Sequence, residues 1–203
     1  MKKILITGAS GFIGSFIVEE ALRRGFETWA AVRATSSRRY LQDSRIRFLE
    51  LDLQDEEKLT EQLRPHRFDY VVHAAGVTKC SNPADFFRVN RDGTAHLFRA
   101  IKSLAMPVER VVFLSSLSVF GAIHERQPYV PITDADQPRP NTCYGRSKLE
   151  AERAARDSGL PVRFPYHSPM PQMTRSSQMG ALARIHHGRP NSSWMRSLKV
   201  RLW

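Results

Sequence analysis

The stretch Thr7-Gly8-Ala9-Ser10-Gly11-Phe12-Ile13-Gly14 decides the fold of this 203-residue chain. It follows an apolar run at residues 4–6 and opens a segment in which apolar residues recur with helical spacing. A strand, a glycine-rich turn and a helix in this order predict a site for a dinucleotide pyrophosphate at the helix N-terminus. Within the turn, we expect Gly8 to permit the tight bend, Gly11 to let main-chain N–H groups approach the phosphates, and Gly14 to let the helix pack closely on the strand. The predicted cofactor contacts in this turn are Gly8, Ser10, Gly11, Phe12, Ile13 and Gly14.

Strand-like and helical segments alternate through the first 163 residues. The predicted strands are residues 4–7, 28–32, 46–51, 70–73 and 110–115, and the predicted helices are residues 12–24, 56–63, 83–104 and 143–158. Gly25 and Gly159 follow two of these helices, where glycine commonly ends a helix. Repeated units of this kind predict an α/β domain, residues 1–163, built on a doubly wound parallel sheet of the Rossmann type.

The sequence changes character after residue 163. Leu160-Pro161-Val162 is expected to begin another buried strand, but the residues that follow are rich in proline, which cannot donate to a central sheet ladder. Residues 164–203 hold six Lys or Arg and no Asp or Glu, without a sustained helix or strand period. We therefore expect a truncated sheet followed by an irregular basic tail at 164–203. The tail is either disordered or translated out of frame, and the abrupt change within the fold favours the second interpretation.

Charge and composition narrow the function classes. The net charge is +11, of which the predicted tail contributes +6, so the first 163 residues carry +5. This remainder suits a protein that binds anionic cofactors, and without a reader motif we expect no nucleic-acid partner. Cys80 and Cys143 are too few for a disulfide framework and lack metal-ligand spacing, which indicates a reducing cytoplasm and no metal site. The apolar run at 4–6 is too short for a signal peptide, and no transmembrane segment is expected.

The residues after the second predicted strand indicate which dinucleotide binds. An acidic residue about 20 positions beyond the glycine turn would accept hydrogen bonds from the ribose hydroxyls of NAD. Arg33 stands at this place instead, with Arg38 shortly behind it, and guanidinium groups suit a 2′-phosphate. NADP is therefore preferred over NAD, the alternative being that these arginines belong to a solvated loop.

Further candidate cofactor contacts follow the third and fourth predicted strands. Asp52 is placed to accept from the adenine amino group while Leu53 packs on the ring, and helix N-capping is an equal alternative for Asp52. His73 ends the fourth strand and is expected to be structural. The small residues after it let a cofactor lie against the backbone, and they are Ala74, Ala75 and Gly76.

The candidate catalytic residues lie near the fifth strand and the last helix. Tyr144 and Lys148 are four positions apart and share one helix face, where the ammonium lowers the phenol pKa and makes the tyrosine a usable acid or base. Ser115 and Ser116 end the fifth strand, where a hydroxyl can orient a substrate oxygen. Asn90 lies on the long predicted helix, as a functional group or as a buried polar link. Taken singly, the Tyr-Lys spacing also fits surface packing, and the serines also fit turn capping.

Together these motifs resemble the extended short-chain dehydrogenase/reductase family, and most closely its NAD-dependent epimerase/dehydratase group. The resemblance covers residues 1–162 and rests on TGASGFIG at 7–14, Asp52-Leu53, HAAG at 73–76, Asn90, SSLSVFG at 115–121 and YGRSK at 144–148. It implies that Ser116 orients the substrate oxygen, Tyr144 transfers its proton, and Lys148 lowers the tyrosine pKa and holds the nicotinamide ribose. Ser116 is chosen because the family's serine or threonine stands just before the segment that here reads LSVFG. By the same resemblance, Asn90 belongs to the active-site architecture and a proton relay.

The resemblance also implies an activity. We expect an NAD(P)-dependent oxidoreductase, epimerase or dehydratase that moves a hydride on a nucleotide sugar or a related hydroxyl or carbonyl compound. A homodimer formed through core helices is common in the family. The family's next strand, with its Arg-Pro-x-x-x-Tyr-Gly-like segment, and its C-terminal substrate lobe are not recognisable here. The alternative function is therefore a dinucleotide-binding module without catalysis.

Overall fold

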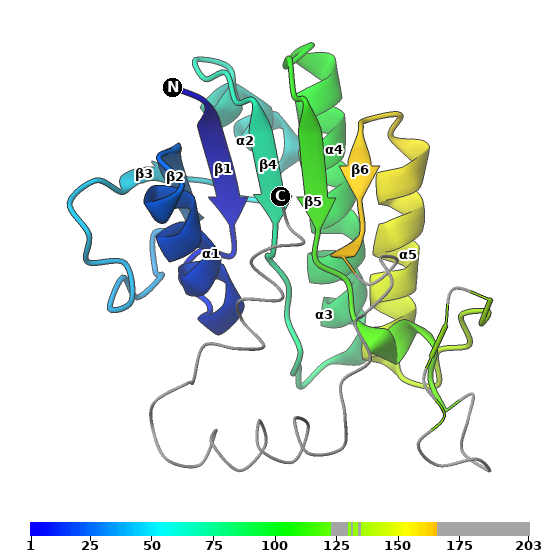
Figure 1. Cartoon of the computed structure of the whole chain (residues 1–203). Helices are drawn as coiled ribbons and strands as arrows, with labels where there is room; N and C mark the ends of the chain where they lie inside the picture. The colour runs from blue at the N-terminus through cyan, green and yellow to red at the C-terminus, as the bar shows by residue number, and fades with distance from the viewer. Residues whose placement is uncertain (123–129, 131, 134, 166–203) are drawn as a thin grey trace, which may run out of the picture.

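The structure is a computed structural model that describes residues 1–122, 130, 132–133 and 135–165 (Figure 1). Most of the predicted tail, residues 166–203, lies outside the described residues. Strands and helices alternate along the described part. The strands are β1 (Lys3–Thr7), β2 (Glu27–Val32), β3 (Arg47–Glu50), β4 (Tyr70–His73), β5 (Arg110–Phe113) and β6 (Val162–Arg163). The α-helices are α1 (Phe12–Arg23), α2 (Glu56–Leu63), α3 (Pro83–Phe86), α4 (Gly93–Ser103) and α5 (Cys143–Asp157).

The strands form one parallel sheet in the order β3-β2-β1-β4-β5-β6. The chain moves outward from β1 to β3, returns across the sheet to β4, and moves outward again, which is the doubly wound arrangement that the sequence predicts. In the pairing register, Thr7 lies beside His73 and His73 lies beside Phe113. The last residues of three central strands therefore meet at one edge, the carboxyl edge, where ligands bind in sheets of this kind.

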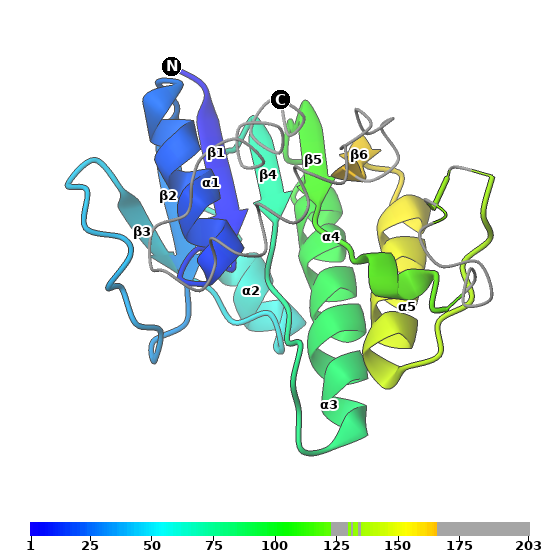
Figure 2. The ribbon, with the colours of Figure 1, turned by 60° about the horizontal axis from the view of Figure 1, so that its bottom comes forward.

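The two faces of the sheet bury different side chains because successive residues of a strand point to opposite faces. Ile4 and Ile6 pack with α1, whereas Leu5 packs with α2, α4 and α5. Figure 2 shows α1 on the opposite side of the sheet from these three helices. Because both faces are covered, the central strands read as continuous apolar runs rather than as alternating ones.

The helix predicted over residues 83–104 is interrupted. It begins as the single turn α3, continues as a π-helix (η1, Phe87–Asp92) and becomes α4 at Gly93. A π-helix is rare, and it changes which residues face inward because each hydrogen bond spans one more residue than in an α-helix. The interruption was not predicted, since the apolar spacing of the segment fits a continuous helix.

The strand region after Leu160 also differs from the prediction. Prolines indicated no recognisable strand there, but Val162–Arg163 pair with Val111 and Val112 of β5 as the short edge strand β6. Proline is tolerated next to β6 because the hydrogen bond between Pro161 and β5 uses the Pro161 carbonyl, which accepts from the Val111 N–H at 3.0 Å, and not the N–H group that proline lacks. The glycines predicted to end two helices, Gly25 and Gly159, do have positive φ angles, 78° and 75°.

Within the described part of the chain, no helix combines the length and the apolar character needed to cross a membrane.

Candidate active site

The glycine turn lies at the carboxyl end of β1. Gly8 has a φ of 67°, and a Cβ atom there would lie 2.6 Å from the backbone of Ala74 and Ala75. A Cβ at Gly14 would overlap the Gly8 carbonyl, so the first turn of α1 packs directly against the bend. Both positions therefore require glycine for the reasons that the sequence suggests.

The surface of this turn is open at the start of α1. Gly11 stands at the N-cap and offers no side-chain cap to the helix N–H groups, and Phe12 and Ile13 are 59% and 47% exposed. An uncapped helix N-terminus beside a glycine bend is suited to the pyrophosphate of a dinucleotide. Ser10, half-buried, completes the turn.

The predicted contacts for the adenosine end lie after β2 and β3. Arg33 and Arg38 are exposed, and the Arg38 guanidinium stacks 4.3 Å from the centre of the Phe48 ring in β3. Asp52 does not cap α2: the cap is Asp55, whose carboxylate accepts from the Lys58 N–H at 3.0 Å. The capping alternative for Asp52 is thus wrong.

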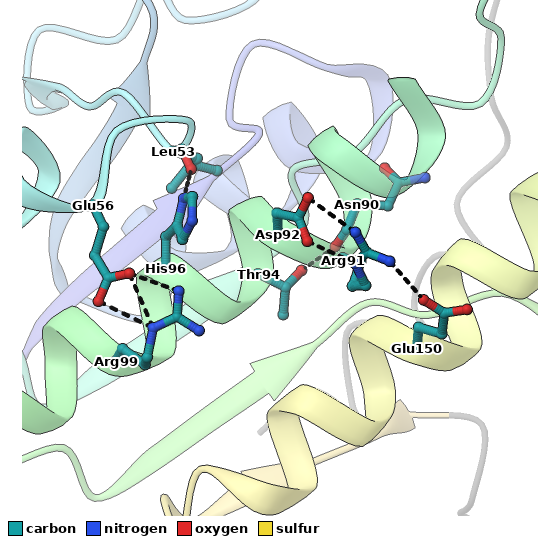
Figure 3. Close-up of polar contacts among 9 residues, drawn as sticks. All are labelled: Leu53, Glu56, Asn90, Arg91, Asp92, Thr94, His96, Arg99 and Glu150. Atoms are coloured by element: carbon teal, nitrogen blue, oxygen red, sulfur yellow. Dashed lines mark hydrogen bonds and ion pairs between the residues drawn. The ribbon is translucent and has the colours of Figure 1, made fainter. Parts of the chain in front are cut away.

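Asp52 and Leu53 occupy the turn between β3 and α2. The Asp52 carboxylate accepts from the Gln54 N–H at 3.0 Å. The Leu53 side chain is partly buried against the core on the α4 side, and its carbonyl accepts from His96 Nδ1 at 2.8 Å (Figure 3). Their predicted contacts with adenine stay predictions.

The segment after β4 passes between the glycine turn and two candidate catalytic side chains. Ala74 and Ala75 pack on Gly8, as described above. Further along, a Cβ at Gly76 would lie 3.0 Å from Asn90 Oδ1 and 4.0 Å from Lys148 Nζ. The small residues therefore bring this backbone close to both groups.

Lys148 is buried in α5 although it carries an ammonium group. Only 4% of it is exposed, its Nζ donates to the Leu114 carbonyl at 2.7 Å, and the Nζ lies 4.3 Å from the centre of the Phe113 ring. Burial lowers its pKa from 10.5 to about 8, partly opposed by the negative charge of Glu152. Perturbed titratable groups of this kind cluster at functional sites.

Tyr144 lies on the same helix face as Lys148, one turn earlier. It is half-buried, and its ring centre lies 6.0 Å from that of Phe86 in α3. Thr142 caps the helix by accepting from the Gly145 N–H at 3.0 Å. A Cβ at Gly145 would overlap the Ser118 carbonyl, so the turn that bears Tyr144 packs directly on the serine segment.

The two candidate serines differ in their surroundings. Ser116 caps the short 3₁₀ helix η2 (Leu117–Val119), and its hydroxyl accepts from the Ser118 N–H at 3.2 Å and donates to the Ser118 hydroxyl at 3.1 Å. The Ser115 hydroxyl oxygen is buried and has no hydrogen-bond partner in the described part of the chain. The choice of Ser116 over Ser115 stays a prediction.

Asn90 is held by both sides of the site. Its Oδ1 accepts from the Val77 N–H at 2.8 Å, and its Nδ2 donates to the Val77 carbonyl and to the Ser147 hydroxyl, both at 3.0 Å. Ser147 in turn donates to the Tyr144 carbonyl at 2.8 Å. The amide is thus engaged by protein groups, which points to an architectural role rather than direct contact with a substrate.

Ion pairs hold the π-helix beside α5. Arg91 bridges Asp92 at 2.6 Å and Glu150 of α5 at 3.1 Å, as Figure 3 shows. No local pattern of residues indicated this clamp. Two further site residues, Ser147 and Phe86, were also missed; for Ser147 a signal existed, since it is a polar residue on the apolar face of α5, three positions after Tyr144.

The fold and the site together are those of an extended short-chain dehydrogenase/reductase: a doubly wound sheet, a glycine turn at β1, and a Tyr-Lys pair beside a serine turn at β5. A model of the NAD dependent epimerase/dehydratase family matches residues 4–172, and the chain belongs to that family of enzymes.

Known proteins extend this likeness. The chain is 33% identical over 175 residues to UDP-glucose 4-epimerase of Mus musculus, an alignment that covers 77% of this chain and 49% of the mouse enzyme. Among solved structures, UDP-glucose 4-epimerase of Thermus thermophilus in complex with NAD has a TM-score of 0.70 and 28% identity, covering 80% of this chain and 53% of that one. The enzyme WbmG of Bordetella bronchiseptica, in complex with NAD and UDP, has a TM-score of 0.69 and 27% identity, covering 80% and 51%. The chain thus spans about half the length of these relatives.

Proposed function

We propose that this chain forms the dinucleotide-binding and catalytic part of a nucleotide-sugar epimerase or a closely related oxidoreductase. One observation carries the proposal: a buried ammonium, Lys148, stands on the same helix face as Tyr144, beside the Gly76 backbone and next to the segment after β5. Burying a lysine costs free energy, so a lysine retained in this place is more readily explained by chemistry than by stability.

The proposed roles follow from the surroundings of each group. The Lys148 ammonium stabilises a phenolate on Tyr144, which then takes a proton from a substrate hydroxyl or returns it. The contact with the Leu114 carbonyl uses one of three N–H donors, which leaves donors for ribose hydroxyls and the tyrosine. The Ser116 hydroxyl, at the end of β5, orients the substrate oxygen. A bound nicotinamide supplies hydride acceptance and donation at the carbon that bears this oxygen.

We further propose that the dinucleotide is NADP in preference to NAD, although the two solved structures named above are complexes with NAD. No Asp or Glu occurs between Glu27 and Asp43, so no carboxylate follows β2 to receive the ribose hydroxyls. The exposed Arg33 and Arg38 offer charge-assisted donors to a 2′-phosphate instead. The substrate is a UDP-sugar by analogy with the UDP bound in one relative and the names of the others. A homodimer stays a prediction.

The catalytic role is tested by Tyr144→Phe in the full chain, with UDP-glucose as the first of a panel of UDP-sugars. We expect turnover to fall by about 10²–10⁴-fold while dinucleotide affinity changes less than about twofold, because only the proton-transfer group is removed. Tyr70→Phe is the matched control, since the Tyr70 hydroxyl bonds Glu109 at the opposite edge of the sheet. Unchanged turnover in Tyr144→Phe would reject the mechanism. Tight binding without turnover by the wild type would favour the non-catalytic dinucleotide-binding module.

The cofactor preference is tested by calorimetric titration with NADP and NAD. We expect NADP to bind at least about tenfold more tightly, and Arg33→Ala to remove that difference, because a charge-assisted hydrogen bond contributes about 1.5–3 kcal/mol. Arg45→Ala serves as the control, since Arg45 lies in the same loop but pairs with Asp43 at 2.7 Å. Equal affinities, or tighter NAD binding, in the wild type would reject the preference.

A further inference from the structure

Three buried polar side chains that the proposed chemistry does not use form a hydrogen-bonded series next to the site. Thr7, His73 and Thr94 come from β1, β4 and α4, and each is 1% exposed. The Thr7 hydroxyl lies 2.7 Å from His73 Nδ1, and the Thr94 hydroxyl lies 2.9 Å from His73 Nε2. The imidazole therefore joins the strand that leads into the glycine turn to the helix that follows Asn90.

The backbone groups that contact this hydrogen-bonded series determine the direction of each hydrogen bond. The Thr94 hydroxyl donates its proton to the Asn90 carbonyl at 2.5 Å, a contact drawn in Figure 3, so it must accept from His73 Nε2–H. Burial lowers the pKa of His73 to about 3, so the ring is neutral and Nδ1 bears no proton. Nδ1 therefore accepts from the Thr7 hydroxyl, whose oxygen accepts from the Ala75 N–H at 3.3 Å.

The two ends of the hydrogen-bonded series contact different parts of the proposed site. At one end, Thr7 holds the backbone of Ala75, which packs on Gly8 of the pyrophosphate turn. At the other end, the Asn90 carbonyl is fixed within the π-helix, while the Asn90 amide binds Val77 and Ser147. Ring contacts with Phe98 and Phe113, at 6.2 and 5.6 Å between centres, hold the imidazole in place.

We propose that His73 is a positioning residue that sets the glycine turn and the π-helical Asn90 in register with each other, through a single tautomer protonated at Nε2. The proposal rests on the proposed function for what the two parts bind and do. The structural part of the proposal does not depend on that function, because three buried groups joined by hydrogen bonds of fixed direction specify one relative placement of β1, β4 and α4.

Two isosteric variants separate the Thr7–His73 hydrogen bond from the His73–Thr94 hydrogen bond. An asparagine places its amide atoms near Nδ1, so His73→Asn keeps the Thr7 contact and loses Thr94. A glutamine reaches the Nε2 position, so His73→Gln keeps the Thr94 contact and loses Thr7. Thr94→Val removes the hydroxyl itself, so it eliminates the His73–Thr94 hydrogen bond without changing His73. Thr28→Val is the matched control, because Thr28 is equally buried, and its hydroxyl donates at 3.1 Å to the Phe26 carbonyl, away from the carboxyl edge.

Two readouts need no turnover. Hydrogen exchange of the Val77 amide, which Asn90 protects, should accelerate about tenfold in His73→Asn and in Thr94→Val relative to Thr28→Val, because one buried hydrogen bond is lost. Dinucleotide affinity should fall about tenfold in His73→Gln and stay within about twofold in His73→Asn, because only the glutamine variant loses the contact that leads to the glycine turn. A purely structural histidine would lower the melting temperature in both variants without this division. Equal effects of the two variants on both readouts would therefore overturn the proposal.

The tautomer gives a third readout, from ¹⁵N NMR of the imidazole in the wild-type chain. The expected signature is an unprotonated Nδ1 and a protonated Nε2, and a ring protonated at Nδ1 would overturn the proposal. If the chain binds neither NAD nor NADP, the proposed function fails, and Val77 exchange and the tautomer still decide the role of His73.

Discussion

The burial of Lys148 predicts a stability cost that disappears at high pH. The folded chain holds the pKa of this ammonium at about 8 because the group is buried, whereas 10.5 is the value expected for an unfolded chain. Between these two values the unfolded state binds more protons, so the free energy of unfolding rises as pH increases. From pH 7 to pH 10 the two pKa values correspond to a rise of about 2.5 kcal/mol from this one group.

Lys148→Met removes the titration while keeping a side chain of similar length. At pH 7 the variant avoids the cost of the buried charge, about 3 kcal/mol, but leaves the Leu114 carbonyl without its donor at a cost of about 1–3 kcal/mol. We therefore expect the variant to be as stable as the wild type at pH 7, or up to about 2 kcal/mol more stable. At pH 10 we expect it to be less stable than the wild type, in which the neutral amine keeps that hydrogen bond.

Urea unfolding at several pH values between 7 and 10 measures the difference between wild type and variant, which cancels the titration of all other groups. Lys102→Met, which removes an exposed lysine of α4, is the control variant. Parallel pH profiles for the wild type and Lys148→Met would refute the reasoning, because the lysine would then titrate alike in the folded and unfolded chains. If the proposed function holds, the same substitution lowers turnover at every pH.

Two further predictions concern packing and an acidic group. Gly145→Ala places a methyl group against the Ser118 carbonyl, so we expect a loss of about 1–3 kcal/mol in urea unfolding and, under the proposed function, at least tenfold lower turnover; wild-type values would contradict the direct packing of α5 on that segment. Arg23, and to a lesser extent Arg24, hold the pKa of Glu20 at about 2, below its ordinary 4.5, so its carboxylate stabilises the fold above pH 4.5, and this contribution is lost as pH falls toward 2. Glu20→Gln should therefore cost about 1 kcal/mol at pH 7 and clearly less at pH 3, a modest figure because Arg23 is largely exposed; a difference independent of pH would contradict the ion pair.

Features coded by residues close together in the chain were predictable. The strand at residues 70–73 and the helix at 56–63 match the predicted bounds, and the other predicted strands and helices outside 83–104 agree to within one or two residues. The bend at Gly8 and the Tyr144-Lys148 spacing were readable for the same reason: a turn depends on φ at one residue, and a helix face depends on a period of 3.6 residues.

The contacts that complete the site join residues far apart in the chain. Asn90 and Ser147 are 57 residues apart, and Thr7 and His73 are 66 apart. No local period encodes them, because they follow from the register of β1 against β4 and from the crossing of the π-helix with α5. The apolar spacing of residues 83–104 is compatible with an unbroken helix. The π-helical turn instead contains Asn90, whose buried amide is hydrogen-bonded to Val77 and Ser147.

Sequence alone therefore specified the β-α order, the glycine turn and the chemical groups available to the site, since each depends on local backbone geometry and side-chain type. The lowered pKa of Lys148, the hydrogen-bond partners of His73 and the choice of Asp55 over Asp52 as the helix cap followed from the packed fold. Desolvation and hydrogen-bond direction depend on every atom that surrounds a group, and most of those atoms belong to distant parts of the chain.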